Sequence, residues 1–251
     1  MNPTHAPEGD KKRINVPETE LNIEPLTAEE IQEDEDRSLS LINTELRRGF
    51  DFIKKYDKSV SIFGSARFKP DDEHSKQAEA LSERIVKELG YAILTGGGPG
   101  IMQAANKGAY DAGGDSLGIA IKLPREQITN PYVKDEVSFY YFFTRKTILT
   151  FAAEAYIFFP GGFGTLDEFF EIITLIQTKK IPRVPVILVG RDFWGPLAAF
   201  IEQHVYSEHK AIDAKDMHLY MIMDDFDQIL EVVKKAPVAN WWKDFGLNGL
   251  N

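Results

Sequence analysis

The stretch Ala155-Tyr-Ile-Phe-Phe-Pro-Gly-Gly-Phe-Gly-Thr-Leu-Asp-Glu168 decides the fold of this chain. Residues 155–159 form an unbroken apolar run, and a strand of that kind is buried on both faces, as in a parallel sheet. The glycine-rich turn that follows leads directly into an amphipathic segment, which indicates a helix. A buried strand, a tight turn and a helix form the repeating unit of an α/β fold.

The same alternation of short apolar runs and longer amphipathic segments extends in both directions from this stretch. We expect strands at 59–63, 91–95, 116–121, 137–141, 155–159, 184–189 and 218–223. We expect helices at 72–89, 100–112, 145–153, 165–178, 194–204 and 226–235. This order predicts an α/β, Rossmann-like fold with a doubly wound, mainly parallel sheet and helices on both faces. Such sheets bind ligands beyond the carboxyl ends of their strands, where the strand order reverses.

Four regions follow from the pattern. Residues 1–25 are polar, contain four prolines and lack apolar periodicity, so we expect a disordered acidic leader. Residues 26–57 carry apolar side chains at three- and four-residue steps, which predicts an N-terminal helix. Residues 58–236 form the Rossmann-like domain, and 237–251 form a C-terminal extension.

The net charge of −10 belongs mostly to the leader and the start of the helix. Residues 1–36 hold eleven acidic and three basic side chains, a net of −8, which leaves −2 for the rest of the chain. A protein that binds duplex nucleic acid needs a basic face, and no basic cluster is evident. We therefore expect no nucleic-acid partner.

The chain has no cysteine, which excludes disulfides, thiol catalysis and thiolate metal sites. The spacing of His204 and His209 does not favour a metal site, and we expect neither metal nor cofactor. No run approaches the roughly 18 apolar residues of a membrane helix, and the N-terminus lacks a secretory h-region. We expect no membrane association and a cytoplasmic location.

Three expected strands end in glycine-rich turns: Gly64-Ser-Ala-Arg67, Gly96-Gly-Gly-Pro-Gly100 and Pro160-Gly-Gly-Phe-Gly164. Glycine lets the backbone approach an anion closely, and a helix N-terminus offers free N–H groups. The turns could equally be tight strand–helix connections. Two dense loops after buried strands favour a phosphate cradle, with Ser65, Gly97, Gly98 and Gly161 as its candidate residues. Neither loop has the Walker or the dinucleotide pattern, so a mononucleotide fits better.

Glu168 allows two interpretations. Thr165 and Glu168 have the spacing of a capping box, in which Thr165 is the N-cap and Glu168 lies three residues on. On spacing alone the capping role is favoured. A carboxylate beside a phosphate cradle could instead stabilise an oxocarbenium-like sugar carbon or orient an attacking water.

The pair Arg145-Lys146 is expected to open the helix that precedes the third glycine turn. Cations at a helix start oppose the macrodipole, and a locally disfavoured choice is a hint of function. Arginine offers a planar fork for phosphate or a base edge, although a plain surface pair is equally consistent with the sequence.

These motifs together resemble the Lonely Guy (LOG) family, long mislabelled as lysine decarboxylases. The Pro-Gly-Gly-x-Gly-Thr-x-x-Glu hallmark is complete at 160–168, the Gly-Gly-Gly-Pro-Gly-Ile-Met loop spans 96–102, and Arg145-Lys146 stands at the family's distance. The match runs from about Ser59 to Phe193. Gln103 departs from the family, which often has Glu there. The long termini are similar to a longer branch of the family.

The resemblance implies a phosphoribohydrolase that splits a cytokinin riboside 5′-monophosphate or AMP into free base and ribose 5-phosphate. It implies Arg145 and Glu168 as the catalytic pair. The substrate-binding residues that it implies are Glu126, Lys146, Gly162, Phe163, Gly164, Thr165, Leu166, Asp167 and Thr174.

An alternative is a non-catalytic nucleotide or molybdenum-cofactor carrier protein on the same fold. The paired Arg145 and Glu168 favour the enzyme, because a carrier needs the glycine cradle but no paired acid. The expected helix 165–178 is apolar over more than one face, which predicts a homo-oligomer, either a dimer or an assembly of dimers.

Overall fold

The computed structural model describes residues 27–122 and 129–237. The chain divides into two compact units, Met1–Leu39 and Ser40–Asn251. The described part of the first unit is the beginning of helix α1 (Ala28–Ile53), within the range where the sequence predicts a helix. The second unit contains the end of α1 and the sheet with its covering helices.

The sheet confirms the expected fold class. Its seven described strands are all parallel, in the order β4-β3-β2-β1-β5-β6-β7. They are β1 (Ser59–Phe63), β2 (Ala92–Thr95), β3 (Ser116–Ile121), β4 (Asp135–Phe139), β5 (Ala155–Phe158), β6 (Val186–Leu188) and β7 (Met221–Ile222). Every residue of β1, β2, β5 and β6 is buried, as the unbroken apolar run at 155–159 predicts for the strands of a parallel sheet.

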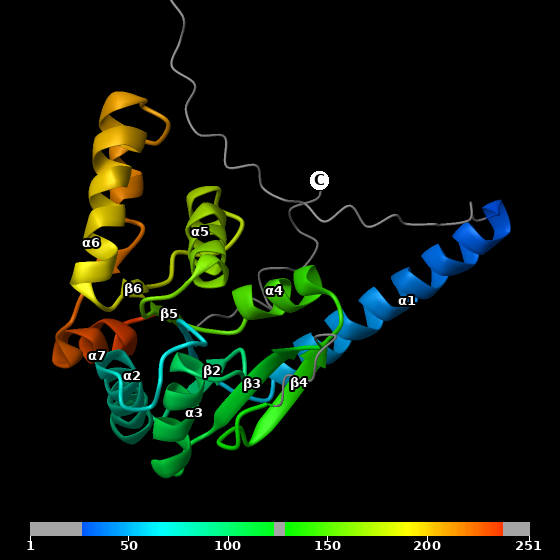
Figure 1. Cartoon of the computed structure of the whole chain (residues 1–251), viewed down its shortest axis with the longest axis horizontal. Helices are drawn as coiled ribbons and strands as arrows, with labels where there is room; N and C mark the ends of the chain where they lie inside the picture. The colour runs from blue at the N-terminus through cyan, green and yellow to red at the C-terminus, as the bar shows by residue number, and fades with distance from the viewer. Residues whose placement is uncertain (1–26, 123–128, 238–251) are drawn as a thin grey trace, which may run out of the picture. The chain divides into compact units, whose positions relative to one another are not determined.

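Helices cover both faces of the sheet, and they separate the core into two clusters. The remaining helices are α2 (Glu73–Arg84), α3 (Ile101–Asp111), α4 (Phe142–Thr150), α5 (Phe163–Gln177), α6 (Arg191–Phe200) and α7 (Phe226–Lys234). Helices α2, α3 and α7 pack on one face around Ile62 and Ile157, and the other face carries α4, α5, α6 and the end of α1 around Phe158 and Phe169 (Figure 1). The result is the doubly wound arrangement that the sequence predicts.

Three further turns complete the described chain: the π-helical turns η1 (Ile85–Leu89) and η2 (Ile201–Glu208), and a 3₁₀ turn η3 (Ala214–His218). The two π-turns extend α2 and α6, where the sequence predicts single continuous helices. Within the described residues no helix has both the length and the apolar character needed to cross a membrane.

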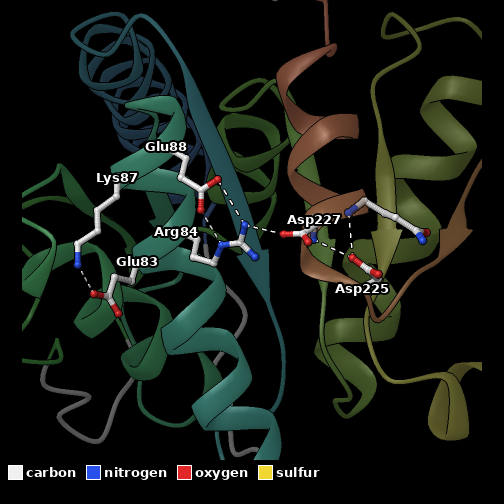
Figure 2. Close-up of polar contacts among 7 residues, drawn as sticks. Glu83, Arg84, Lys87, Glu88, Asp225 and Asp227 are labelled. Atoms are coloured by element: carbon white, nitrogen blue, oxygen red, sulfur yellow. Dashed lines mark hydrogen bonds and ion pairs between the residues drawn. The ribbon is translucent and has the colours of Figure 1, made fainter.

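Helix α7 is tied to α2 and η1 by charged side chains at the surface (Figure 2). Arg84 donates from Nε to Glu88 Oε1 (2.6 Å) and from Nη2 to Asp227 Oδ1 (2.7 Å). Asp225 caps α7 by accepting from the backbone N–H of Asp227 (2.9 Å) and Gln228 (3.1 Å). Solvent-exposed ion pairs contribute little to stability, so this contact orients α7 more than it stabilises the fold.

Candidate active site

The three glycine turns lie side by side because β2, β1 and β5 are neighbours in the sheet. The N–H of Ser65, after β1, donates to the carbonyl oxygen of Pro160, after β5 (3.0 Å). The carbonyl oxygen of Ser65 accepts from the N–H of Ile101 at the start of α3 (3.0 Å). The strand order reverses between β1 and β5, so the turns meet where α/β sheets bind their ligands.

A buried polar network holds the second glycine turn. Asn130 Nδ2 lies 3.1 Å from the carbonyl oxygen of Gly97 and 3.0 Å from that of Gly98, and also 2.9 Å from Asn106 Oδ1. Thr95 Oγ1 donates to Asn106 Oδ1 (2.6 Å) and accepts from the N–H of Gly97 (2.9 Å). Because buried polar groups are costly unless paired, this network fixes the turn in one conformation.

A cavity of about 840 Å³ opens between these turns. That volume suits a ligand of mononucleotide size. The lining residues come from the ends of β1, β2 and β5 and from four helices: Phe63, Gly64, Ser65, Ala66, Arg67, Phe68, Gly96, Met102, Arg145, Pro160, Gly161, Gly162, Phe163, Gly164, Thr165, Leu166, Glu168 and Phe193. A second cavity of about 630 Å³ lies at the far end of α5, away from the glycine turns.

Helix α5 begins two residues before the position predicted from the sequence. Its N-cap is Gly162, no side chain caps it, and the first internal bond runs from Leu166 N–H to the Gly162 carbonyl oxygen (3.0 Å). The capping box of Thr165 and Glu168 is therefore wrong, because Glu168 lies in the second turn of the helix. The first turn keeps N–H groups that no side chain caps, at the rim of the cavity, as an anion site requires.

Helix α4 also begins earlier than predicted, at Phe142 instead of Arg145. Arg145 is its fourth residue, and its N–H already donates to the carbonyl oxygen of Tyr141 (3.3 Å). The expected helix start at Arg145 and Lys146 is therefore wrong. The side chain of Arg145 turns into the cavity, where Nε donates to the carbonyl oxygen of Ile119 in β3 (2.8 Å).

Arg145 and Glu168 meet inside the cavity. Arg145 Nη1 lies 3.9 Å from Glu168 Oε1, and their side chains are only 13% and 10% exposed. The guanidinium lies so close to Gly96 that a Cβ there would fall 2.4 Å from Nη2. Gly96 is thus needed for close approach, and the second glycine turn accommodates the arginine as well as any ligand.

Burial raises the pKa of Glu168 from 4.5 to about 7, and the nearby Arg145 guanidinium partly opposes this shift. Burial also lowers the pKa of Arg145, and the charge of Glu168 counteracts the shift. A carboxyl group that titrates near neutrality in a cleft beside a fixed cation is a candidate catalytic group.

The structure separates the other expected site residues into three sets. Ser65, Gly161, Gly162, Phe163, Gly164, Thr165 and Leu166 line the cavity with the catalytic candidates. Lys146, Asp167, Thr174, Gly97 and Gly98 are not among its lining residues. Glu126 lies outside the described residues.

The structure shows why these five residues do not line the cavity. Lys146 Nζ is engaged outside the cavity by Asp167 Oδ2 (2.8 Å) and Glu171 Oε2 (3.2 Å), so this pair ties α4 to α5. Thr174 is exposed and lies nearly two helical turns beyond Glu168. In the second glycine turn it is Gly96 that reaches the cavity, while the carbonyls of Gly97 and Gly98 bind Asn130.

Arg67, Phe68 and Phe193 also line the cavity and are not among the site residues expected from the sequence. Arg67 and Phe68 follow the first glycine turn. Phe193 follows Gly190, at the carboxyl end of β6 and the start of α6. A fourth glycine after a buried strand was the available signal, because that strand ends at the same edge of the sheet.

The fold and the cavity define a class: a Rossmann-like α/β protein with a glycine-lined ligand site and an arginine–glutamate pair inside it. The family model described as "Possible lysine decarboxylase" matches residues 102–233. The chain belongs to this family, the LOG family.

The curated relatives are named as phosphoribohydrolases. The cytokinin riboside 5′-monophosphate phosphoribohydrolase LOG of Oryza sativa subsp. japonica is 34% identical over 142 residues, which cover 55% of this chain and 57% of the relative. The enzyme LOG5 of Arabidopsis thaliana is 27% identical and covers 76% of this chain and 83% of the relative. The cytokinin riboside 5′-monophosphate phosphoribohydrolase of Rhodococcoides fascians is 26% identical, and the match covers 58% of this chain and 74% of the relative. These names support a hydrolase family.

Among solved structures, the molybdenum cofactor carrier protein of Chlamydomonas reinhardtii shares the fold with a TM-score of 0.52 and 23% identity, covering 72% of this chain and 98% of that chain. The molybdenum cofactor binding protein of Rippkaea orientalis does so with a TM-score of 0.51 and 24% identity, covering 70% and 93%. Likenesses at this identity show the fold alone.

Proposed function

We propose that this protein hydrolyses the N-glycosidic bond of a nucleoside 5′-monophosphate, either AMP or a cytokinin riboside 5′-monophosphate. The observation that carries the proposal is the buried pair of Arg145 and Glu168, 3.9 Å apart, in a cavity lined by glycine turns. The names of the relatives supply the substrate class.

Each part of the site has a task in this reaction. The uncapped first turn of α5 and the neighbouring glycines bind the 5′-phosphate through backbone N–H groups. The ionised Glu168 faces the ribose, where it stabilises positive charge on C1′ and orients the attacking water. The C1′–N bond breaks, hydroxide from water bonds to C1′, and the remaining proton leaves on the base. Arg145 binds the substrate and favours the ionised form of Glu168, because its charge opposes the rise in the pKa of that carboxyl group.

The buried acid separates this proposal from a carrier function. A carrier needs a cradle for its ligand and has no use for the Glu168 carboxyl group. Burial of this group disfavours its charged form, which is a cost without benefit in a carrier. A carrier on this fold would bind a nucleotide and release it unchanged.

The test is incubation with AMP and with isopentenyladenosine monophosphate, followed by chromatography of the free base. Glu168→Gln should lower the rate by about 10²-fold or more, because it keeps the shape and removes the charge. Glu231→Gln, an exposed change on α7, is the matched control and should behave as wild type. Binding without base release would refute the proposal and favour the carrier.

A further inference from the structure

Glu45 is a buried carboxylate in the second half of α1 for which the proposed reaction has no use. It is 4% exposed. It lies outside residues 102–233, which the family model matches. Burying a carboxylate is costly unless donors surround it, so its contacts should explain why it is there.

All of its described hydrogen bonds go to the start of α4. Oε1 accepts from the N–H of Tyr140. Oε2 accepts from the N–H of Tyr141 (3.4 Å) and from Thr144 Oγ1 (2.7 Å). Tyr141 is the N-cap residue of α4, and its own side chain provides no cap. The acceptor at this helix end therefore comes from a residue about 95 positions earlier in the chain.

A negative charge at a helix N-terminus is favourable because it faces the positive end of the macrodipole and the free N–H groups. Hydrogen bonds to a charged acceptor are also stronger than those between neutral groups. Glu45 thus contributes both to the start of α4 and to the direction in which the helix leaves β4.

The residues that Glu45 contacts lie within one helical turn of Arg145. Tyr141 donates its N–H to Glu45, and its carbonyl oxygen accepts the N–H of Arg145 (3.3 Å). Thr144, which is fully buried, is bonded to Glu45 and directly precedes Arg145. The Glu45 carboxylate is therefore connected to the Arg145 backbone through Tyr141 and Thr144.

Close packing keeps α1 in place for this role. Gly49, one turn after Glu45, lies so close to α4 that a Cβ there would fall 2.4 Å from Ile148 Cγ1. At the end of α1, Phe52 and Ile53 are buried in the core. Beyond it, Tyr56 Oη donates to Asp135 Oδ2 of β4 (2.9 Å).

We infer that Glu45 is a positioning residue for the active site: the second half of α1 sets the start of α4 through this carboxylate and thereby the position of Arg145 beside Glu168. The inference rests on the proposed function, since it assumes that Arg145 acts on the substrate. The second half of α1 then contributes to the geometry of the active site.

The test compares kcat, KM and the pH profile of base release for wild type, Glu45→Gln and Glu45→Ala. The control is Asp51→Ala, which removes an exposed acid from the same helix. Glu45→Gln keeps the shape and one acceptor but places an NH₂ group against N–H donors, so its defect should be intermediate. Glu45→Ala should lower kcat about tenfold or more and raise KM by less, because small misplacements of a catalytic group are costly.

The pH profile separates positioning from simple stability. Arg145 lowers the pKa of Glu168, so a displaced Arg145 should move the midpoint of the profile to higher pH. A variant that melts at a lower temperature but keeps the wild-type kcat and midpoint would overturn the inference. If Glu45→Ala does not fold, an unchanged kcat and midpoint in Glu45→Gln would overturn it in the same way.

Failure of the proposed function would look different. If the wild-type protein binds AMP and releases no base, the proposed reaction is wrong. The affinity for AMP then reports whether Arg145 is correctly positioned. A weaker affinity in Glu45→Ala, with Asp51→Ala unchanged, would still support the positioning role. Equal affinities would overturn it.

Discussion

The pKa of Glu168 makes a quantitative prediction about the pH dependence of base release. With a pKa of about 7, the ionised fraction of Glu168 rises from about 9% at pH 6 to about 91% at pH 8. The proposed reaction uses the ionised form, so kcat/KM should rise about tenfold over this interval. A glutamate with the ordinary pKa of 4.5 would give a flat profile there.

The assay is base release from AMP at constant ionic strength between pH 5 and 9. The phosphate of the substrate also titrates, with a pKa of about 6, and must be separated from Glu168. Arg145→Met provides the separation. It removes the charge that opposes the rise in the Glu168 pKa, so the enzyme midpoint should move to higher pH while any step from the phosphate stays in place.

The ionisation of Glu168 should also affect the free energy of unfolding, which should fall with pH where the rate of base release rises. The folded-state pKa lies above the unfolded value, so ionisation of Glu168 costs folding free energy, and stability falls as pH rises from about 4.5 through about 7. A difference of about 2.5 pKa units corresponds to about 3 kcal/mol as an upper bound. Glu168→Gln should therefore melt higher than wild type at pH 8 and similarly at pH 4. A flat rate profile between pH 6 and 8, or no gain in melting temperature at pH 8, would refute the reasoning.

Three further predictions concern the surroundings of the pair. Gly96→Ala should lower kcat/KM roughly tenfold or more, because the added Cβ would fall 2.4 Å from Arg145 Nη2. The control is Gly195→Ala, whose added Cβ would have no atom within 4 Å and should leave kcat/KM unchanged. Equal kinetics of the two variants would contradict the prediction. Deletion of residues 1–25 should leave melting temperature and activity unchanged, because the segment lacks apolar periodicity, and a loss of either would show that it contributes. Light scattering should show that the wild-type protein is a dimer or a larger assembly. Phe170 is an apolar residue of α5 that is 40% exposed, and Phe170→Asp should dissociate the assembly and abolish activity. A stable and fully active wild-type monomer would refute the pairing.

The sequence predicted the sheet well because short, mostly apolar runs alternate with amphipathic segments, and four of the seven described strands are buried at every residue. The expected ranges for β1 and β3 agree with the structure at both ends. The β4–α4 connection was placed two to three residues too late. Residues 137–143 are mostly aromatic and β-branched and favour a strand locally, and the acceptor that starts α4 belongs to Glu45. A cap supplied from another helix leaves no local pattern to recognise.

The site was predicted in part for similar reasons. Glycines at strand ends identified the edge of the sheet and the turns that meet there. The identity of the glycine that faces the cavity depends on Asn130, whose side chain binds the carbonyls of Gly97 and Gly98 from elsewhere in the chain. The cap assigned to Thr165 failed because Gly162 can start the helix without a side-chain acceptor. Local spacing predicts local bonds, and these positions are set by contacts over longer distances.

The pairing of β1 with β5 has a consequence for synthesis of the chain on the ribosome. Val60 pairs with Ala155, so the first and third glycine turns come together only after about 95 further residues have been made. Pairing of strands this distant in sequence is slow, because closing the long loop costs entropy before the contact is made. A ligand stabilises only a state that already contains its binding site. A nascent chain that has not yet exposed residues up to Glu168 therefore folds without help from any ligand of this site, whatever the concentration of that ligand in the cell.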